Sequence, residues 1–192
     1  VTPFIGDLNE GLSGRASPKD LETLMQLIWL RMTAPRADST AMQALVQQFD
    51  AVLRNKDANP AAVFSDTVQV TLANGHPRVR PLSVEMLKEL DLAQMLAIYK
   101  DRFGDASDFT FLFVGNVDLA TFKPLVEQWL AALPSTGRKE TFRDVGPKLF
   151  SGTIDKTVRK GLAPQSQTAL LLAGTDSWSR EQAYLLSSVG EV

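Results

Sequence analysis

Residues 91–134 read DLAQMLAIYKDRFGDASDFTFLFVGNVDLATFKPLVEQWLAALP, and this stretch decides the fold. Its first part has apolar residues at helical spacing behind Asp91, a side chain suited to cap a helix. Residues 109–114 then form a short apolar run rich in aromatic residues, which predicts a strand buried on at least one face. Asp118 caps a second predicted helix, which ends at Pro134. The sequence therefore predicts a helix, a central strand and a helix.

The residues before this stretch predict one or two strands followed by helices. Residues 1–16 have scattered apolar residues with Gly6, Gly11 and Gly14, which indicates one or two strands joined by a turn. Ser17 and Pro18 are typical of a helix start, with Ser17 as the N-cap. Apolar spacing and helix-start residues predict helices to about Thr33, from about Ser39 to Arg54, from Asn59-Pro60 onward and over Ser83–Leu90.

The residues after Pro134 have a different composition. Residues 135–148 are polar and contain glycine and proline, which is typical of a linker. Strands are predicted near Thr153–Val158 and at Thr168–Ala173, and a helix begins near Ser177. Because this region is too short to bury a core alone, we interpret it as the opening of another domain. In the first domain, Phe122 and Trp129 are predicted to be buried against the strand at 109–114.

Composition excludes several classes of function. The net charge of -2 gives no electrostatic reason to expect nucleic acid or an anionic membrane. No apolar run approaches the roughly 20 residues that span a bilayer. The chain has no cysteine and one histidine, which excludes thiolate metal sites, a cysteine nucleophile and any site that needs two histidines within the chain. The abrupt start and the stop inside a predicted helix indicate a piece of a longer polypeptide.

The residues that suggest chemistry also have ordinary structural interpretations. His76 has no second ligand beside it, so we interpret it as a hydrogen-bonding residue of the loop at 74–81. Arg78 and Arg80 suit a carboxylate or a peptide terminus, although such arginines more often tie a loop to its own domain. Residues 115–118 follow a strand and open a helix, but they have one glycine and no following Lys-Ser/Thr, so capping explains them. The sequence predicts no catalytic residue and no metal ligand.

Several of these motifs, in order and with their spacing, resemble the repeated domain of the pitrilysin/insulinase zinc metallopeptidases. They are His76-Pro77-x-x-Arg80-Pro81, Leu90-Asp91-Leu92 leading to Ile98-Tyr99, Phe113-Val114-Gly115-Asn116-Val117-Asp118, and Leu133-Pro134. No single motif is specific, but the series covers about Ser17–Pro134. Residues 1–16 and the helix after Ser17 look closest to the non-catalytic third domain of large bacterial zinc proteases, and residues 150–192 resemble the beginning of the fourth.

What the resemblance implies is limited by the residues that are missing. The His-x-x-Glu-His motif of the family is absent, and Gln47 and Gln48 stand where its third zinc ligand, a glutamate, is expected. The resemblance therefore implies a non-catalytic, chamber-forming domain of a zinc metalloendopeptidase, with zinc in the catalytic domain of the parent protein. Its implied partners are the catalytic half of the same polypeptide and a peptide substrate. The resemblance favours the bacterial periplasm or cell envelope, although composition leaves the compartment open.

We therefore expect an α+β fold, in which helices cover one face of an antiparallel sheet and an incomplete second α+β segment follows. The expected domains are an inactive pitrilysin/insulinase-like domain at 1–134 that lacks its own N-terminal part, a linker at 135–148 and the beginning of a similar domain at 149–192. Peptide contacts are expected at Ser13, Arg15, Arg78 and Arg80. The sheet edge at residues 8–15 is expected to accept an extended peptide by strand addition.

Two other functions stay open at this point. One is a structural subunit or interaction scaffold of the same family that has lost proteolysis. The other is an unrelated α+β interaction module, which requires the motif series to be accidental. The chain alone is expected to be inactive, and the rest of the reading frame decides whether the parent is an enzyme.

Overall fold

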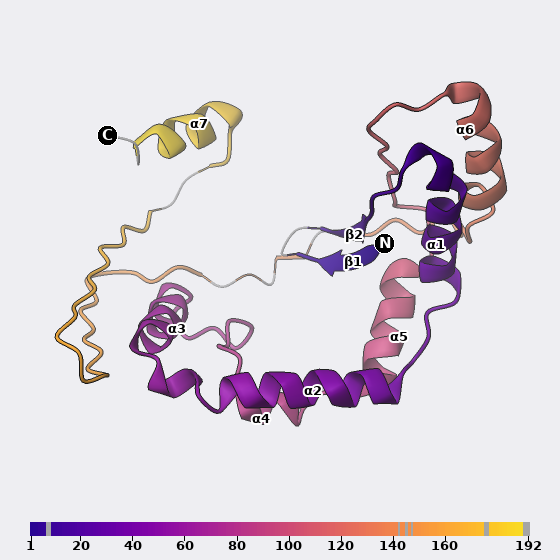
Figure 1. Cartoon of the computed structure of the whole chain (residues 1–192). Helices are drawn as coiled ribbons and strands as arrows, with labels where there is room; N and C mark the ends of the chain where they lie inside the picture. The colour runs from indigo at the N-terminus through magenta and orange to yellow at the C-terminus, as the bar shows by residue number, and fades with distance from the viewer. Residues whose placement is uncertain (7–8, 142, 145, 147, 175–176, 190–192) are drawn as a thin grey trace. The chain divides into compact units, whose positions relative to one another are not determined.

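The computed structural model describes the whole chain except residues 7–8, 142, 145, 147, 175–176 and 190–192. The chain divides into two compact units (Figure 1). Unit 1 contains residues 1–51 and 83–144, and unit 2 contains residues 52–82 and 145–192. Most regular structure is helical, and the sheet formed by described residues has two antiparallel strands. The chain is therefore α+β, as predicted, with a smaller sheet than the sequence suggests.

The chain opens with the predicted hairpin. Strands β1 (Thr2–Ile5) and β2 (Glu10–Ser13) pair antiparallel, with Thr2 opposite Ser13. Gly11 lies opposite Phe4, and a Cβ atom at Gly11 would come within 2.9 Å of the Phe4 ring. A larger residue at this position would therefore require the partly exposed Phe4 ring to move. Part of the predicted turn, residues 7–8, lies outside the described residues.

A short 3₁₀ turn, η1 (Pro18–Asp20), leads into helix α1 (Leu21–Thr33). Ser17 has the extended backbone of an N-cap, but its side chain accepts no hydrogen bond from a backbone N–H. Its hydroxyl instead donates to the carboxylate of Asp20 at 2.6 Å. The predicted position of the helix start is confirmed, but Ser17 does not make the side-chain capping hydrogen bond that its N-cap position predicts.

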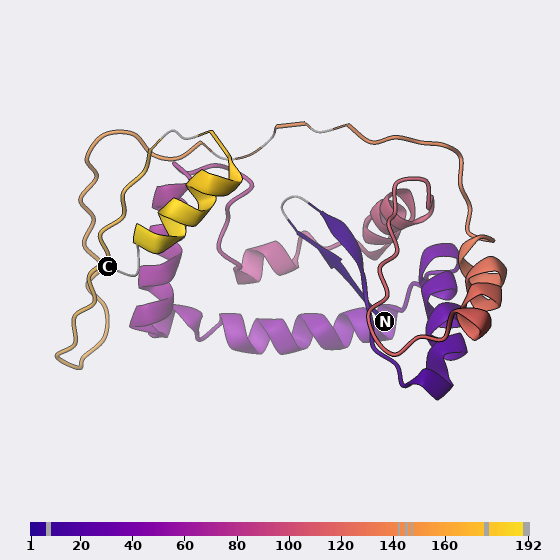
Figure 2. The same cartoon turned by 90° about the horizontal axis from the view of Figure 1, so that it is seen from above.

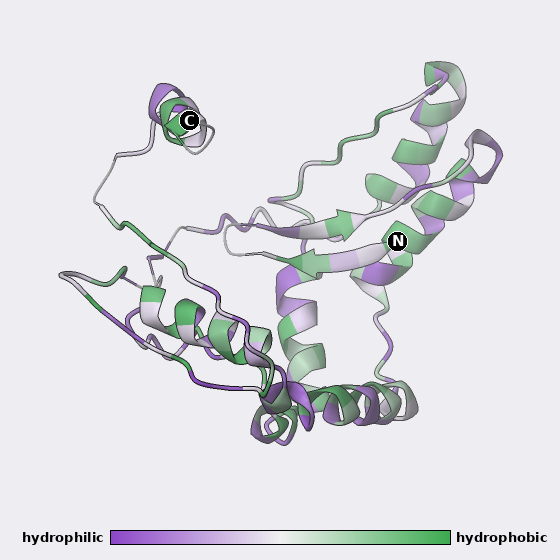
Figure 3. Ribbon diagram, turned by 60° about the vertical axis from the view of Figure 1, so that its left-hand side comes forward, coloured by the Kyte–Doolittle hydropathy of each residue, from purple (hydrophilic) through white to green (hydrophobic). Residues whose placement is uncertain are grey.

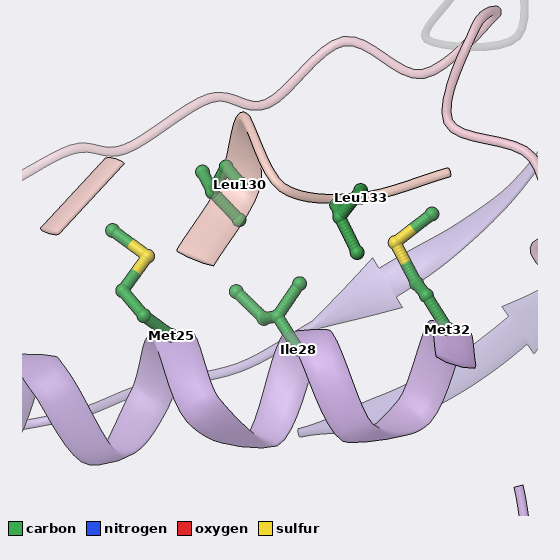
Figure 4. Close-up of a cluster of buried hydrophobic side chains, with 5 residues drawn as sticks. All are labelled: Met25, Ile28, Met32, Leu130 and Leu133. Atoms are coloured by element: carbon green, nitrogen blue, oxygen red, sulfur yellow. The ribbon is translucent and has the colours of Figure 1, made fainter. Parts of the chain in front are cut away.

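The core of unit 1 lies between α1 and the helix before Pro134. Figure 4 shows three side chains of α1 facing Leu130 of that second helix and Leu133 in the turn that follows it. These buried residues are Met25, Ile28, Met32, Leu130 and Leu133. Burying a side chain of this size contributes roughly 1.5–3 kcal/mol. Because the three α1 residues recur at helical spacing, the apolar stripe read from the sequence is the stripe that packs.

Helix α5 (Leu92–Phe103) begins where the sequence predicts, because the Asp91 carboxylate accepts a hydrogen bond from the Gln94 N–H at 2.8 Å. Phe103 at its end is fully buried and stacks on Tyr99 with ring centroids 4.5 Å apart. Burial raises the pKa of Tyr99, and the charge of Arg31 acts against this shift. The short helix α4 (Val84–Leu87) precedes α5 and is capped by Ser83.

The helix predicted after Asp118 changes type half-way. It begins as α6 (Leu119–Leu125), with Asp118 accepting from two backbone N–H groups, and continues as a π-helical turn, η3 (Val126–Leu130). Pro124 has no N–H to donate to the preceding turn, and downstream the Ala131 N–H reaches the Val126 carbonyl at 2.9 Å. Figures 1 and 2 both show α6 beside α1.

The predicted burial of Phe122 and Trp129 is only partly correct, because both side chains are half-buried. Phe122 meets Phe113 edge to face, with ring centroids 5.0 Å apart. The ring contact of Trp129 is with Trp29 of α1, at 6.3 Å, and its indole N–H is buried without a partner among the described residues.

The three strands predicted outside the hairpin are not present as regular strands. Residues 109–114, 153–158 and 168–173 have no ladder hydrogen bonds within the described part of the chain. The physical reason is the same for each segment, since a strand exists only when a neighbour supplies its hydrogen-bond partners. The side chains at 109–114 nevertheless alternate between half-buried and exposed, which is the period of a strand.

Helix α2 (Ser39–Leu53) begins in unit 1 and ends in unit 2. Unit 2 continues with η2 (Lys56–Ala58) and α3 (Pro60–Leu72), which is capped by Asn59 as predicted. Lys56 joins parts of this unit, pairing with Asp66 at 2.6 Å and donating to the Leu82 carbonyl at 3.2 Å. The Phe150 N–H donates to the Leu72 carbonyl at 3.3 Å.

The end of unit 2 is little packed, since nearly all described residues from 151 to 189 are exposed. It closes with helix α7 (Arg180–Val189), which has no buried residue. The helices carry hydrophilic and hydrophobic residues together (Figure 3). In the part of the chain that the structure describes, no helix has the length and hydropathy needed to cross a membrane.

Candidate functional site

Unit 1 contains a groove of about 920 Å³. Residues 9–18, which include β2, line it, and so do residues 109–117. Leu24 and Ile28 of α1 contribute apolar surface to its lining. We call this feature the strand groove, because the segments that line it are β2 and the strand-like residues 109–114.

The side chains of residues 109–114 divide into two sets. Phe109, Phe111 and Phe113 are half-buried and pack against the core of unit 1. The other set points away from the core, with Leu112 84% exposed and Val114 90% exposed. An exposed apolar pair at alternate positions is what one face of a sheet presents when nothing covers it.

A chain of ion pairs lies at one end of the strand groove. Arg102 of α5 pairs with Glu10 of β2 and with Glu140, which it reaches at 2.5 Å. Arg138 pairs with Glu140 and, at 3.0 Å, with Asp101. Two carboxylates of this cluster, Glu10 and Glu140, line the groove, and each has an arginine partner.

The pKa values at this end follow from the pairing. Burial opposes the charge of Arg102, but hydrogen bonds and charge from Glu10 and Glu140 outweigh it and raise the pKa of the guanidinium. Hydrogen bonds from Arg138 and Arg102 lower the pKa of Glu140 against the effect of its burial. A carboxylate held ionised in this way is a poor general base, since its proton affinity is reduced. The cluster therefore joins β2, α5 and residues 138–140 structurally.

A second polar cluster, centred on Asp105, fixes the residues that follow Pro134. The Asp105 carboxylate accepts from the Ser107 hydroxyl, the Thr136 hydroxyl and both of their backbone N–H groups. These hydrogen bonds hold the pKa of Asp105 well below its usual range, beginning with the bond from Ser107. The Ser107 hydroxyl also accepts from the Gly137 N–H at 2.8 Å. Residues 135–137 are thus tied to the end of α5, although their composition resembles a linker.

The predicted peptide-contact residues fall in both units. Ser13 and Arg15 line the strand groove of unit 1 and are exposed. Arg78 and Arg80 are exposed residues of the loop at 74–81 in unit 2. Their role in peptide binding stays a prediction. Leu112 and Val114 were not among the candidate peptide contacts predicted from the sequence. The alternation of residues 109–114 with a period of two was the signal that could have identified their outward face.

The other candidate residues have the structural roles that the sequence predicts. His76 Nδ1 accepts a hydrogen bond from the Arg78 backbone N–H at 3.2 Å, within its own loop. Residues 115–118 lead into the cap of α6, where Asp118 accepts from the Ala120 and Thr121 N–H groups at 3.3 Å. Gln47 lines a smaller cavity of about 500 Å³ beside Leu90 and Asp91. Among the described residues, no three His, Cys, Asp or Glu side chains are grouped to hold a metal ion.

Comparisons with known proteins point to one family. Residues 89–192 match the family model of the peptidase M16 inactive domain. The whole chain is similar to a probable zinc protease, PqqL, of Haemophilus influenzae, with 22% identity over 201 residues that make up 20% of that protein. Over 60% of its length the chain is 27% identical to a zinc protease PQQL-like protein of Arabidopsis thaliana, of which it covers 12%. The chain thus spans a fifth or less of these relatives, and no solved structure matches it.

Proposed function

The chain belongs to the family of the peptidase M16 inactive domain, the pitrilysin/insulinase family, and on this premise we propose that it forms a non-catalytic wall of the substrate chamber of a zinc metalloendopeptidase. The observation that carries the proposal is the match of more than half of the chain to an inactive domain. Two relatives that bear the name zinc protease support it. A wall of this kind binds and orients a peptide, while the bond chemistry takes place elsewhere.

The surface proposed to face the peptide is built on residues 109–114. Leu112 and Val114 present apolar side chains on the face that turns away from the core of unit 1. Ser13 and Arg15 add a hydroxyl and a positive charge to the same groove lining. Exposed apolar and cationic groups together suit a peptide that carries apolar side chains and a carboxylate. Arg78 and Arg80 are proposed as further peptide contacts from unit 2.

Zinc and catalysis are proposed to belong to the catalytic half of the parent polypeptide. That half is expected to carry His-x-x-Glu-His on a helix, because two histidines four residues apart share one helix face and the glutamate beside them activates the zinc-bound water. Gln47 and Gln48 occupy the corresponding ligand position in this chain and are not zinc ligands of the usual kind. The catalytic half is therefore the proposed partner of this chain.

The domain organisation is proposed to follow the same family pattern. Residues 1–134 form one inactive domain that lacks its own N-terminal part, residues 135–148 connect it onward, and residues 149–192 begin a second, similar domain. In the complete first domain, helices would cover one face of a sheet larger than the two-stranded hairpin. The exposed apolar residues of residues 149–192, among them Leu170 and Leu172, support the idea that this segment is completed by further chain.

The test separates the two halves of the parent. The catalytic half expressed alone is expected to bind zinc and to cleave peptides weakly, because metal binding is local whereas substrate orientation requires the opposing wall. Adding the complete second half, which contains this chain, is expected to raise kcat/KM for peptides by about tenfold or more through orientation. The zinc content, measured by atomic absorption, is expected to stay unchanged.

A matched pair of variants connects that gain to this chain. Arg15→Glu, in the groove lining, is expected to reduce the gain in kcat/KM, whereas Lys19→Glu, an exposed residue outside the groove lining, is expected to leave it intact. If the parent lacks His-x-x-Glu-His, or the second half leaves peptide turnover unchanged, the chamber-wall role fails. A scaffold function without proteolysis then takes its place.

A further inference from the structure

A second cavity of unit 1 lies between α2 and the start of α5, and we call it the α2 cavity. Its volume is about 500 Å³. The apolar part of its lining consists of Met42, Val46, Leu90 and Leu92. Met42 and Val46 are four residues apart on α2, so their side chains share one face of that helix. The cavity therefore offers a ligand apolar contact along one turn of α2.

Four polar side chains complete the lining, and they are Ser39, Gln43, Gln47 and Asp91. The side chains of the first three have no hydrogen-bond partner among the described residues and are exposed. Asp91 Oδ1 accepts the capping hydrogen bond of α5, and within the same part of the chain Oδ2 accepts none. An apolar cavity with a few convergent polar groups is the usual composition of a ligand site.

The two glutamines are spaced to match the backbone of an extended peptide. Gln43 and Gln47 are four residues apart, which corresponds to a rise of about 6 Å along an α-helix. Two residues of a strand rise about 6.6 Å and present their N–H and C=O groups on the same side. Each glutamine amide has donors and an acceptor, so it can pair with a peptide N–H and C=O. Such pairing is independent of the peptide's sequence.

The charge of the lining selects among peptides. Asp91 is the one charged residue among the described residues of this lining. The N-terminal end of α5 offsets about half a unit of its charge, so the carboxylate remains net negative. A lysine or arginine side chain could therefore form a charge-assisted hydrogen bond with Oδ2 while its methylene groups lie on Leu90 or Leu92. An acidic peptide residue at the same place would be repelled.

We propose that the α2 cavity binds an extended segment of the peptide substrate, with Gln43 and Gln47 on its backbone and Asp91 on a lysine or arginine side chain. This proposal rests on the proposed function, because it takes the occupant to be a peptide substrate of the parent. It adds a preference for basic residues that the strand groove does not predict, since Arg15 there suits a carboxylate.

Binding without hydrolysis tests the charge preference. The parent protein, kept inactive by a zinc chelator, is titrated into two fluorescein-labelled nonapeptides of serine, alanine and leucine that differ only in a central lysine or glutamine. Fluorescence anisotropy is expected to show about tenfold tighter binding of the lysine peptide. Asp91→Asn is expected to abolish this difference, because asparagine caps a helix as well as aspartate does but carries no charge. A lysine preference that survives Asp91→Asn overturns the proposal.

A matched pair of substitutions on α2 tests the contact with the peptide backbone. Gln47→Ala is expected to weaken both peptides about fivefold through the lost hydrogen bonds. The control is Gln48→Ala, at the next exposed residue of α2 and outside the lining, which is expected to leave both affinities unchanged. Alanine is a good helix former, so neither substitution disturbs α2. Equal effects of the two substitutions overturn the proposal. A wild-type parent that binds neither peptide also overturns it, since its own chain then closes the cavity.

The two proposals can fail separately. A parent that hydrolyses peptides only with its second half, but binds both peptides equally, would retain the chamber-wall function and lose the basic-residue site. A parent that shows the Asp91-dependent lysine preference but no hydrolysis would retain the site and lose the chamber-wall function.

Discussion

Residues 109–114 and residues 168–173 were both predicted as strands, and the structure treats them differently. The first segment places three phenylalanines against the core of unit 1 and exposes the residues between them. The second segment is exposed on both faces, with Leu170 86% and Leu172 91% exposed. Neither has a ladder partner among the described residues. A strand therefore needs two kinds of neighbour, a helix layer for its side chains and a second strand for its backbone, and the first segment has only the helix layer.

The largest expected effect on the free energy of unfolding is at Phe103, whose ring packs against Phe109 of the first segment. Phe103 is fully buried, with 0% relative exposure, and its ring contacts those of Tyr99 and Phe109. Phe103→Ala is expected to reduce the free energy of unfolding by about 3–5 kcal/mol, because it removes a large side chain and leaves a cavity. Leu170→Ala, in the second segment, is expected to change it by less than about 0.5 kcal/mol.

Urea unfolding followed by the fluorescence of Trp29 and Trp129, which lie in contact in unit 1, measures both variants. A loss of less than about 1 kcal/mol for Phe103→Ala would contradict the placement of the first segment on a packed helix layer.

The sequence predicts the helices well because their signals are local. Asp91, Asn59 and Asp118 were identified as helix starts from their type and position, and each accepts backbone N–H groups of its helix. The apolar stripe of α1 was likewise readable from its spacing. Ser17 shows the limit of such signals, since it stands at the helix start but accepts no backbone N–H, and its hydroxyl donates to Asp20 three residues away.

The strands and the site were less predictable because their causes are not local. The pattern of residues 109–114 identifies two faces correctly, but no pattern within the segment says which strand lies beside it. The ion pairs between Arg102, Glu10 and Glu140 join residues that are far apart in the sequence. The polar composition of residues 135–148 suggested a linker, and the Asp105 cluster that holds its first residues becomes visible only in three dimensions.

An intermediate effect on thermal stability is expected at the Asp105 cluster, which holds the residues that follow Pro134. Because hydrogen bonds from Ser107 and Thr136 lower the pKa of Asp105 in the folded state, its contribution to stability is fully present above the ordinary aspartate pKa of about 3.9. It is lost as pH falls from that value toward the lower folded pKa. Asp105→Asn is therefore expected to lower the thermal midpoint at neutral pH, and the difference from the wild type is expected to shrink below about pH 4.

Melting curves from pH 3 to 7, followed by circular dichroism, measure this dependence, and Asp155→Asn, an exposed residue of unit 2, is the control. Faster amide exchange at Thr136 and Gly137 in Asp105→Asn would show that the lost bonds are those of the cluster. A difference between wild type and Asp105→Asn that stays constant over the whole range would mean that the ionised carboxylate is not the stabilising form.

The smallest expected effect lies in the second segment and depends on the length of the chain. Leu172→Ser replaces an apolar side chain that is 91% exposed, so in this chain it is expected to change the free energy of unfolding by less than about 0.5 kcal/mol. If residues 149–192 begin a domain that further chain completes, the same side chain becomes buried in the parent, and the substitution then costs about 1–3 kcal/mol there.

Leu162→Ser, at a fully exposed leucine next to Gly161, serves as the control and is expected to have a small effect in both proteins. Urea unfolding of both variants in both proteins gives the comparison. An equal and small effect of Leu172→Ser in the parent would show that the second segment stays uncovered there. The contrast between the two segments would then be a property of the protein itself, and the proposal that residues 149–192 open a further domain would fail.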